Sequence, residues 1–350
     1  MKRGAVILVN YGDYAEKHLA ECYESLINQS YPKFYWSLFI VDNASTAATQ
    51  KNIRALAPES QLIVNPANQG WGGGNNRGIE TALKRGFDAV ICLNMDTKVD
   101  IRWLEALMKD ADRPDIHILQ SKILIYGTDR INSLGNRIQF LGYGYCNGYK
   151  KRQAERRGYP MDFASGASML IKREVFERIG FFREDYFMYG EDLEFCWRAR
   201  LAGFRLGFCE ESLCHHKYDH KKILRHADLV DCNRIKALCT LEKIGSLLLI
   251  LPLLILWEIF VLAYFLVTGE GHKTFRLIRF FVCPGTWVEV KKIRQDIAGF
   301  RVCRDRELIR NFSAILVMEE GNPLIRFAAR VLVNPILWIY WNTVRWMIVW

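Results

Sequence analysis

Three short apolar segments of the sequence each end in Asn or Asp, and these side chains are the first candidates for a binding site. Asn10 follows one such segment, Asp42 follows a second, and Asn94 and Asp96 follow a third. Each segment reads as a β-strand, and the carboxyl ends of parallel strands line one crevice at the edge of a sheet. The four side chains can therefore share a single ligand. A carboxylate such as Asp96 could hold a divalent cation that bridges the phosphates of a substrate.

Asp96 also has an ordinary structural interpretation as a helix cap. A helix is predicted to begin at Ile101, and acidic residues are common at helix N-termini. Thr97 or Asp100 could serve as that cap instead, which leaves Asp96 available for a cation.

Three histidines, His215, His216 and His220, follow much later in the chain. One of them could complete a metal site with Asp96, because imidazole is a common metal ligand. A structural role is the alternative for each of these histidines.

A second pair of acids, Glu191 and Asp192, comes directly after Tyr189-Gly190 at the start of a predicted amphipathic helix. The helix dipole alone favours acidic residues at this position. It does not explain why two adjacent acids follow Tyr-Gly. A carboxylate at the edge of a crevice could accept the proton of an attacking hydroxyl, which is general-base catalysis.

The segment Asn68–Gly78, NQGWGGGNNRG, joins a predicted strand to a predicted helix. Glycines at such a junction let the backbone approach a phosphate, and the N-terminus of the helix is positive. The spacing matches neither the GxGxxG motif nor the Walker loop. A flexible loop without a ligand therefore remains an alternative.

Strands and helices alternate through the first part of the chain, which favours a parallel α/β sheet. The strands are continuous apolar runs, as expected when helices cover both faces of the sheet. The predicted strands are Ala5–Val9, Leu38–Val41, Leu62–Val64 and Ala89–Leu93, and the predicted helices are Ala15–Gln29, Ala47–Ala57, Asn75–Arg85 and Ile101–Ala111.

The pattern loosens between about Ile118 and Tyr159, where the basic run Lys150–Arg157 is expected to be a mobile loop. A strand at Ser168–Ile171 and a short helix at Glu174–Ile179 are predicted next.

Composition and charge narrow the class of protein. Half of the 350 residues are hydrophobic and a quarter are charged, which indicates a globular chain with an ample core. The net charge of +10 fits an anionic membrane surface or a phosphorylated substrate, and without a zinc-finger or RNA-binding motif no nucleic-acid partner is expected. The ten cysteines form no CxxC pair, and the N-terminal apolar run is too short for a signal peptide. We therefore expect free thiols in a reducing cytosol.

The composition shifts after about Lys221, where apolar, aromatic and basic residues dominate. Ile244–Val267 has Glu258 as its only charged residue and is long enough to span a bilayer, but Pro252 and Glu258 interrupt it. Basic residues on both sides give it no preferred orientation. We expect residues 221–350 to be a helical region bound to the membrane in a monotopic or peripheral way, with both chain ends cytoplasmic. The alternative is a buried helix of a soluble domain.

Six segments, taken together in their order and spacing, resemble one protein family: VDNAST, NQGWGGGNNRG, NMD, SGASMLIKREVFERIGFF, FMYGEDLEFCWR and SLCH. They are similar to family 2 glycosyltransferases, in the branch of bacterial rhamnosyltransferases of cell-wall and O-antigen assembly. The resemblance covers about residues 4–220, and more weakly the tail to about residue 310. It implies a GT-A α/β catalytic domain in residues 1–220, a nucleotide-sugar donor, Mg²⁺ or Mn²⁺, and inversion at the anomeric carbon.

The resemblance also assigns roles to individual residues. Asp42 would contact the base or ribose of the donor, Asp96 would be the metal-binding acid of a DxD-type motif, and Asp192 would be the catalytic base beside Glu191. The implied donor-binding residues are Asn10, Asp42, Asn68, Gly72, Gly73, Gly74, Asn75, Asn94 and Asp96. His215 fits the family's metal or diphosphate contact better than His216, because Ser-Leu-Cys precedes it.

One position departs from the usual DxD pattern. Asn94 stands where most such motifs have an acid, an NxD form that also occurs in the rhamnosyl-type branch. With one fewer anionic ligand, metal binding would depend more on the donor diphosphate.

The expected function is therefore an inverting, metal-dependent glycosyltransferase at the cytoplasmic face of the cell membrane. It would move a sugar from dTDP-rhamnose or a UDP-sugar to a lipid-linked (polyprenyl) or oligosaccharide acceptor of a cell-surface glycan. Two alternatives stay open: a GT-A nucleotidyltransferase, and an inactive relative that acts as a binding or scaffold protein. Retention of Asp96 and Asp192 favours an active enzyme, and Gly72–Gly74 lie too far from the N-terminus for a nucleotidyltransferase.

Overall fold

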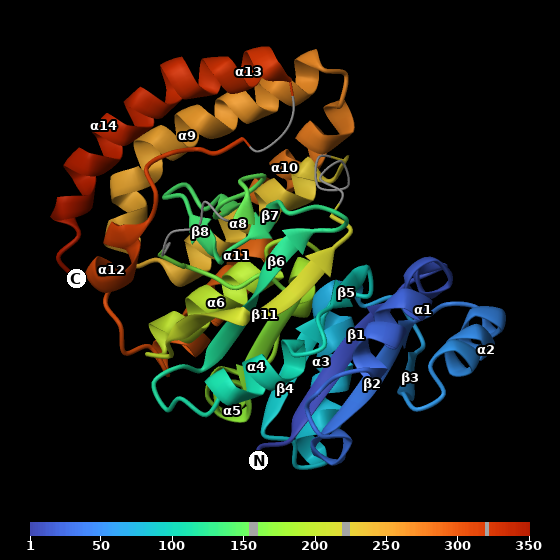
Figure 1. Cartoon of the computed structure of the whole chain (residues 1–350). Coiled ribbons are helices and arrows are strands. Elements are labelled where there is room, and N and C mark those ends of the chain that lie inside the picture. Colours follow the sequence, from blue (N-terminus) through green and yellow to red (C-terminus); the bar gives the residue numbers. More distant parts are fainter. Residues whose placement is uncertain (154–159, 219–224, 319–321) are drawn as a thin grey trace. The chain divides into compact units, whose positions relative to one another are not determined.

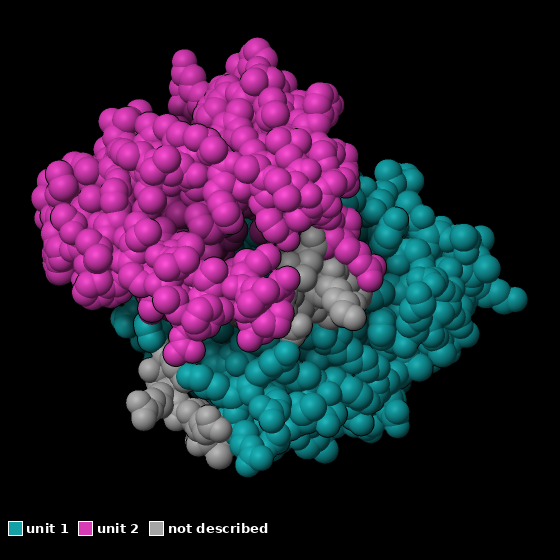
Figure 2. Space-filling model, turned by 90° about the horizontal axis from the view of Figure 1, so that it is seen from above, with its two compact units in different colours: residues 1–136, 146–199, 204–218 teal, residues 137–145, 200–203, 219–350 magenta. Residues whose placement is uncertain are grey.

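The structure is a computed structural model that describes residues 1–153, 160–218, 225–318 and 322–350. It contains two compact units, coloured teal and magenta in Figure 2. Unit 1 comprises residues 1–136, 146–199 and 204–218, and unit 2 comprises residues 137–145, 200–203 and 219–350. The boundary predicted between residues 220 and 221 lies outside the described residues. Part of the predicted loop 150–157 lies outside them as well.

Unit 1 is built on a mixed β-sheet, part of which appears in blue to yellow in Figure 1. Among the described residues, its strand order is β3-β2-β1-β4-β10-β6-β11-β5, with β7 paired to β6. The strands are β1 (Gly4–Asn10), β2 (Trp36–Asn43), β3 (Gln61–Asn65), β4 (Ala89–Leu93), β5 (Thr97–Val99), β6 (Ile118–Ile125), β7 (Ile131–Ser133), β10 (Ser168–Lys172) and β11 (Leu206–His216). Two further short strands, β8 (Asn136–Ile138) and β9 (Gly144–Cys146), form a separate pair.

The helices of unit 1 follow the predicted alternation with strands. They are α1 (Tyr14–Ile27), α2 (Ala47–Leu56), α3 (Gly70–Lys84), α4 (Trp103–Asp110), α5 (Arg173–Ile179) and α6 (Glu191–Leu201), with short 3-10 turns η1 (Lys33–Tyr35) and η3 (Glu184–Tyr186). Every strand and helix predicted in this part of the chain is present, with ends that shift by up to a few residues. The largest shift is in α3, which begins at Gly70 rather than Asn75.

The parallel arrangement expected for the first part of the chain is confirmed for β1 to β4, and the sheet is mixed beyond β4. Strands β1 to β4 are parallel, but β10 runs antiparallel to both β4 and β6. Strand β6 was missed because its centre, Gln120-Ser121-Lys122, breaks the apolar pattern. These polar side chains are buried and hydrogen-bonded; Ser121, for example, pairs with the hydroxyls of Ser168 and Ser212. Tertiary partners here replace the hydrophobic signal on which the sequence prediction depended.

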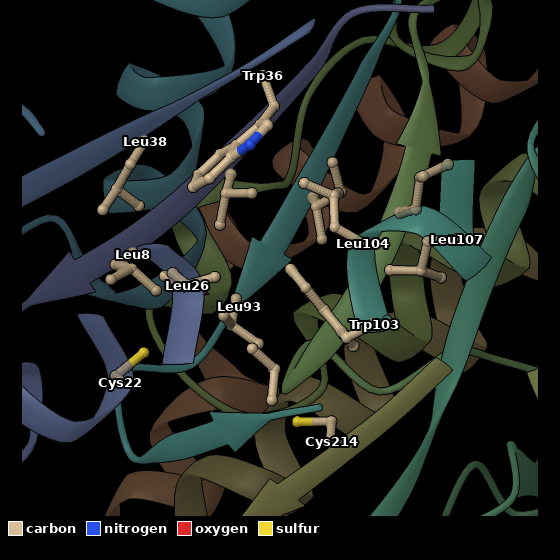
Figure 3. Packing of buried hydrophobic residues seen from close by; sticks show 14 of the residues in the cluster. Leu8, Cys22, Leu26, Trp36, Leu38, Leu93, Trp103, Leu104, Leu107 and Cys214 are labelled. Carbon is tan, nitrogen blue, oxygen red and sulfur yellow. The ribbon is translucent and has the colours of Figure 1, made fainter. Parts of the chain in front are cut away.

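Helices cover both faces of the sheet, as predicted. On one face, Leu8 and Leu38 pack with Leu26 of α1 and Trp103 of α4 in one hydrophobic cluster (Figure 3). On the other face, Ile7 lies against Gly78 of α3, where a Cβ would come within 2.7 Å of the Ile7 side chain. The sheet is therefore a rigid platform that fixes the positions of its strand ends.

Unit 2 is mainly helical. Its helices are α8 (Ala227–Leu241), α9 (Ile244–Val267), α10 (Gly271–Val282), α11 (Pro284–Ala298), α12 (Asp305–Leu308), α13 (Pro323–Ala328) and α14 (Asn334–Val344). A π-turn, η5 (Ala329–Val333), joins α13 to α14, and 3-10 turns η4 (Ile309–Asn311) and η6 (Arg345–Met347) complete the unit. Among the described residues, two helical stretches, Ile244–Val267 and Pro323–Met347, are long and apolar enough to cross a membrane.

Candidate active site

The carboxyl ends of β1 and β2 bring Asn10 and Asp42 together, and both side chains are fully buried. Asn10 donates through Nδ2 to Asp42 Oδ1 at 2.7 Å and accepts from the N–H of Ala15 at 2.8 Å. The other oxygen of Asp42 accepts from the N–H of Ser45 at 3.3 Å and from Gln50 Nε2 at 3.0 Å. Asp42 thus organises this end of the sheet. Its contact with the base or ribose of a donor stays a prediction.

Side-chain amides fix the start of α3 over the ends of β2 and β3. Asn43 Nδ2 donates to the carbonyl of Gly70 at 2.8 Å, and Asn65 Nδ2 donates to Asn43 Oδ1 at 2.7 Å. Asn68 Oδ1 accepts from the N–H of Gly70 at 3.0 Å. Asn43 and Asn65 are buried and were not predicted as site residues, although Asn43 belongs to the VDNAST segment. Asn68 is half-buried beside them.

The glycine segment, for which a flexible loop was the alternative, is the first part of helix α3. Gly72–Gly74 are buried, and Asn75 Nδ2 donates to the carbonyl of Trp71 at 2.9 Å within the helix. A Cβ at Gly74 would lie 2.7 Å from both Asn43 Nδ2 and Val9 Cγ1. These glycines therefore allow the helix to approach the sheet closely. Direct donor contacts of Gly72, Gly73, Gly74 and Asn75 stay predictions.

Trp71 connects two parts of the site. Its indole Nε1–H donates to Asn94 Oδ1 at 2.9 Å. The same ring covers Gly166, where a Cβ would lie only 2.6 Å from Trp71 Cζ2. The backbone N–H of Asn94 donates to the carbonyl of Ala167 at 3.0 Å, so Asn94 is held from two directions. The segments around Asn94 and Gly166 are thereby fixed next to each other.

Asp96 lies just beyond β4, buried, with its Oδ1 3.2 Å from Nε2 of His216. Nδ1 of His216 lies 3.1 Å from Asn132 Oδ1, an atom that can only accept a hydrogen bond. Nδ1 therefore donates to Asn132, and Nε2 faces Asp96. The Tyr14 hydroxyl also bonds to Asp96, and burial together with the Asp96 charge raises the pKa of Tyr14.

The structure places His216, and not His215, beside Asp96, and a metal-binding role for either histidine stays a prediction. Neighbouring residues of β11 point to opposite faces of the sheet, so only one of the two histidines can reach Asp96. His215 is half-buried near Asp100, and burial lowers its pKa. His220 lies outside the described residues.

The alternative of Asp96 as a helix cap is also excluded. Helix α4 begins at Trp103, and its N-cap position is Arg102. Asp100 Oδ1 accepts from the N–H of Arg102 at 3.1 Å. Asp96 is separated from that helix by strand β5.

The carboxylate of Asp96 and the imidazole of His216 are groups that commonly bind divalent cations. Within the described ranges, no group of three or more His, Cys, Asp and Glu side chains gathers in a way that could hold a metal. The chain thus offers one carboxylate and one imidazole, a pair that Mn²⁺ accepts. Asn132 orients the imidazole as outer-shell acceptors do for metal-bound histidines. Further ligands would have to come from a bound diphosphate or from water.

Asp192 is held at the first turn of α6 by two backbone donors. Its Oδ2 accepts from the N–H of Gly166 at 3.0 Å, and its Oδ1 accepts from the N–H of Leu193 at 2.8 Å. Burial raises the pKa of Asp192 above its ordinary value, and the two N–H groups limit that rise. Burial, together with the Asp192 charge, raises the pKa of the neighbouring Glu191 to about 8. Of the two acids, Asp192 is therefore the one whose carboxylate form the fold stabilises by hydrogen bonds.

The described residues thus form one continuous path of hydrogen bonds, ring packing and chain neighbours through the site. It runs from Asp96 and Asn94 through Trp71 to Gly166 and Asp192. At one end, the half-buried carboxylate of Asp192 can accept a proton, and at the other end the carboxylate of Asp96 and the imidazole of His216 can hold a cation. Trp71 and Gly166 were not predicted as site residues, although both occur in the conspicuous segments NQGWGGGNNRG and SGASML. Asn132 carried no signal in the sequence.

Comparisons with known proteins address the fold and the family. A family model described as "Glycosyl transferase family 2" matches residues 5–180. A Haloferax volcanii protein named low-salt glycan biosynthesis hexosyltransferase Agl10 is 26% identical over 209 residues, which cover 59% of this chain and 64% of that protein. A Mycobacterium tuberculosis protein named N-acetylglucosaminyl-diphospho-decaprenol L-rhamnosyltransferase is 28% identical over 204 residues, which cover 52% of this chain and 66% of that one. The chain thus spans slightly under two thirds of the length of these relatives.

Among solved structures, GalNAc-T7 with UDP, GalNAc and Mn²⁺ superposes with a TM-score of 0.53 at 15% identity. The match covers 69% of this chain and 48% of that one. At this identity the likeness concerns the fold alone, and it confirms a GT-A-like α/β fold with a mixed sheet.

Proposed function

The chain belongs to glycosyl transferase family 2, and we propose that it transfers a sugar from a nucleoside diphosphate to an acceptor hydroxyl with inversion of configuration. The observation that carries this proposal is the hydrogen-bond geometry around the Asp192 carboxylate. This half-buried carboxylate accepts from the N–H groups of Gly166 and Leu193, and the Trp71 ring that packs on Gly166 donates to Asn94 beside Asp96. The arrangement supplies a proton acceptor at a fixed position relative to a candidate diphosphate site.

In the proposed reaction, the Asp192 carboxylate accepts the proton of the acceptor hydroxyl. The acceptor oxygen forms a bond to the anomeric carbon as the bond from that carbon to the diphosphate oxygen breaks. The electron pair of the broken bond leaves with the nucleoside diphosphate. A single displacement of this kind inverts the configuration at the anomeric carbon. Glu191, protonated at neutral pH, adds no second negative charge next to the base.

Asp96 and His216 are the residues that we propose to hold Mg²⁺ or Mn²⁺ together with the donor diphosphate. Such an ion would neutralise the charge that develops on the leaving group. Asn94 contributes no charge and already accepts from Trp71, so its role is to fix the loop that carries Asp96. The proposed donor pocket also includes Asn10, Asp42, Asn68 and Gly72–Asn75, as the family resemblance implies.

The names of the relatives guide the proposed donor and acceptor. One is named as a rhamnosyltransferase whose acceptor is linked to decaprenol by a diphosphate, and another as a hexosyltransferase. We propose dTDP-rhamnose or a UDP-sugar as the donor, and a lipid-linked (polyprenyl) or oligosaccharide acceptor. The enzyme would then work at the cytoplasmic face of the membrane, bound by residues 221–350.

The deciding experiment is donor turnover by the purified chain. A panel of nucleotide sugars is incubated with protein, and release of nucleoside diphosphate is measured with Mn²⁺, with Mg²⁺ and with EDTA. We expect one donor to be consumed, and EDTA to abolish its consumption. Binding without turnover for every donor and acceptor tested would favour the inactive scaffold. Release of pyrophosphate from a nucleoside triphosphate would favour the nucleotidyltransferase.

A further inference from the structure

Helix α9 in unit 2 has an outward face that is entirely apolar. The exposed large side chains along it are Ile244, Leu248, Leu251, Ile255, Leu256, Ile259, Phe260, Tyr264, Leu266 and Val267. Glu258 is the only charged residue of the helix, and it is buried. A soluble monomer rarely exposes a continuous apolar surface of this extent. A partner is therefore required to cover it.

The rotation of α9 is fixed by polar contacts on its inward face. Glu258 Oε1 accepts from Arg234 of α8 at 2.5 Å, and the same guanidinium reaches Asp231. Trp257 Nε1 donates to the hydroxyl of Tyr143 at 2.9 Å, and that hydroxyl donates to Asp231. A buried ion pair of this kind strongly disfavours any rotation that would expose one partner alone. The network thus holds the apolar face of α9 outward.

A second helical stretch, Pro323–Met347, runs beside α9 within unit 2, as the orange and red helices of Figure 1 show. Tyr340 donates its hydroxyl to the carbonyl of Leu249, and Trp350 donates through Nε1 to Ser246 Oγ at 2.9 Å. The exposed apolar side chains of the stretch Pro323–Met347 are Leu324, Phe327, Val331, Leu332, Ile336, Trp338, Ile339, Trp346 and Met347. We call α9 and Pro323–Met347 the apolar helix pair.

We propose that the apolar helix pair is a membrane-docking surface that lies in the plane of the bilayer. Its outward faces are embedded in one leaflet, and its basic flank, formed by Arg326 and Arg330, lies at anionic headgroups. The proposal deepens the proposed function and rests on it for the membrane-bound acceptor. It names the surface that would carry the enzyme to that acceptor.

Charge and residue type favour a lipid surface over a second copy of the chain. Arg326 and Arg330, one helical turn apart, are both exposed on the same flank of the second helix. Trp338 and Trp346 are exposed as well, and Trp with Arg beside apolar residues is typical of a membrane interface. Residues 221–350 contain 19 Lys and Arg against 11 Asp and Glu, which is eight of the ten net positive charges of the chain. Two copies would repel each other through this charge, whereas anionic lipid attracts it.

The contacts of α9 oppose a membrane-spanning arrangement, although its length would allow one. Polar partners are spaced along its whole inward face: Asp305 at Ser246, Arg234 at Glu258, and Thr274 at the carbonyl of Leu262. A helix that crossed the bilayer with these contacts intact would carry the charged groups of Arg234 in α8 and Asp305 in α12 into the hydrocarbon. That position is costly for charged side chains. A helix in the plane of the interface keeps every contact and still buries the outward face.

The first test is flotation of the full chain with vesicles. We expect binding to phosphatidylcholine vesicles that contain phosphatidylglycerol, and weaker binding to pure phosphatidylcholine. The double variant Ile255→Asp/Ile259→Asp places two charges on the outward face and should reduce partitioning at least about tenfold. Phe34→Asp, at an exposed position of unit 1, is the matched control and should bind like wild type. Equal flotation of the double variant and wild type would overturn the proposal.

Two further measurements keep the proposal falsifiable should the double variant fold poorly. Arg326→Gln/Arg330→Gln should lose most of the preference for phosphatidylglycerol, and an unchanged preference contradicts the proposed contact of the basic flank with anionic lipid.

An epitope inserted between Gly269 and Glu270 should react with antibody only in inside-out membrane vesicles. Reaction only in right-side-out vesicles would show that α9 spans the membrane. A detergent-free dimer that ignores vesicles and dissociates in Ile255→Asp/Ile259→Asp would assign the surface to a second copy.

Donor turnover of the same variants in detergent separates the two proposals. We expect it to match wild type, because all four substituted residues lie in unit 2 and all the residues proposed for catalysis lie in unit 1. Vesicle binding without turnover of any donor would contradict only the proposed function. Turnover without vesicle binding would contradict only the proposed docking surface.

Discussion

The indole N–H of Trp71 donates a 2.9 Å hydrogen bond to the side chain of Asn94, across 23 positions of sequence. This bond joins the start of helix α3 to the loop after β4, where Asp96 lies. Because the same indole covers Gly166, whose N–H donates to Asp192, the two proposed catalytic regions share one support. Displacing that ring should disturb both regions together.

The first prediction concerns Gly166→Ala. The new Cβ would lie 2.6 Å from Trp71 Cζ2, so the ring must move and its bond to Asn94 must weaken. Overpacking of this kind typically costs ~1–3 kcal/mol. We expect donor affinity and kcat each to fall by roughly tenfold, as measured by calorimetry and steady-state kinetics. Gly271→Ala is the matched control, since no atom lies within 4 Å of its added Cβ. Wild-type kinetics in Gly166→Ala would remove Trp71 from the site.

The second prediction is that Asp192→Asn abolishes transfer and leaves donor binding nearly intact. The amide keeps the shape of the carboxylate but cannot accept the proton of the acceptor hydroxyl. General-base catalysis typically contributes about 10²–10⁴-fold, so kcat should fall by at least 10²-fold. Residual turnover above about a tenth of wild type would show that another group is the base.

The third prediction is an acidic limb in the pH profile of kcat/KM. The proposed mechanism requires an ionised Asp192, and burial raises the pKa of that carboxyl above its ordinary value of 3.8. Activity should therefore rise with pH through a midpoint above 3.8. In Glu191→Gln this midpoint should stay in place, because Glu191, whose pKa is about 8, is already neutral in that range. A midpoint that moves in Glu191→Gln would assign the limb to Glu191.

The fourth prediction compares neighbouring histidines. His216→Ala should weaken Mn²⁺-dependent donor binding by at least about tenfold, as should Asp96→Ala, because both remove a proposed ligand. His215→Ala is the matched control and should bind donor normally, since His215 lies on the opposite face of β11. Calorimetric titrations with Mn²⁺ and with EDTA provide the measurement. The opposite ranking of the two histidines would restore the sequence-based choice of His215.

The fifth prediction concerns stability. Glu242 is buried in unit 2, its carboxyl oxygens make no hydrogen bond within the described residues, and burial raises its pKa well above the ordinary 4.5. With a raised folded-state pKa, its contribution to stability is present below about pH 4.5 and is lost as the pH rises. Glu242→Gln should therefore stabilise the protein at pH 8 by on the order of 1 kcal/mol, with little difference near pH 4.5.

Thermal unfolding at both pH values measures this effect, with Asp296→Asn, an exposed acid of α11, as the control. Equal or lower stability of Glu242→Gln at pH 8 would show that the ionised carboxylate is well accommodated.

Local sequence determined the strands β1 to β4, the helices between them and the positions of Asp96 and Asp192. Continuous apolar runs and the polar residues that end them depend only on neighbours in the chain, and parallel strand ends must meet at one edge of a sheet. The six spaced segments likewise indicated the family, which the family model confirms.

Tertiary structure decided what depends on partners distant in the chain. Strand β6 is held by serines of β10 and β11, so its polar centre gave no strand signal. The glycines of α3 mark a close approach of helix to sheet rather than a loop, because Val9 and Asn43 lie against Gly74. The choice of His216 over His215 depends on the face of β11 that each one occupies, and sequence cannot give that face until the strand and its neighbours are known.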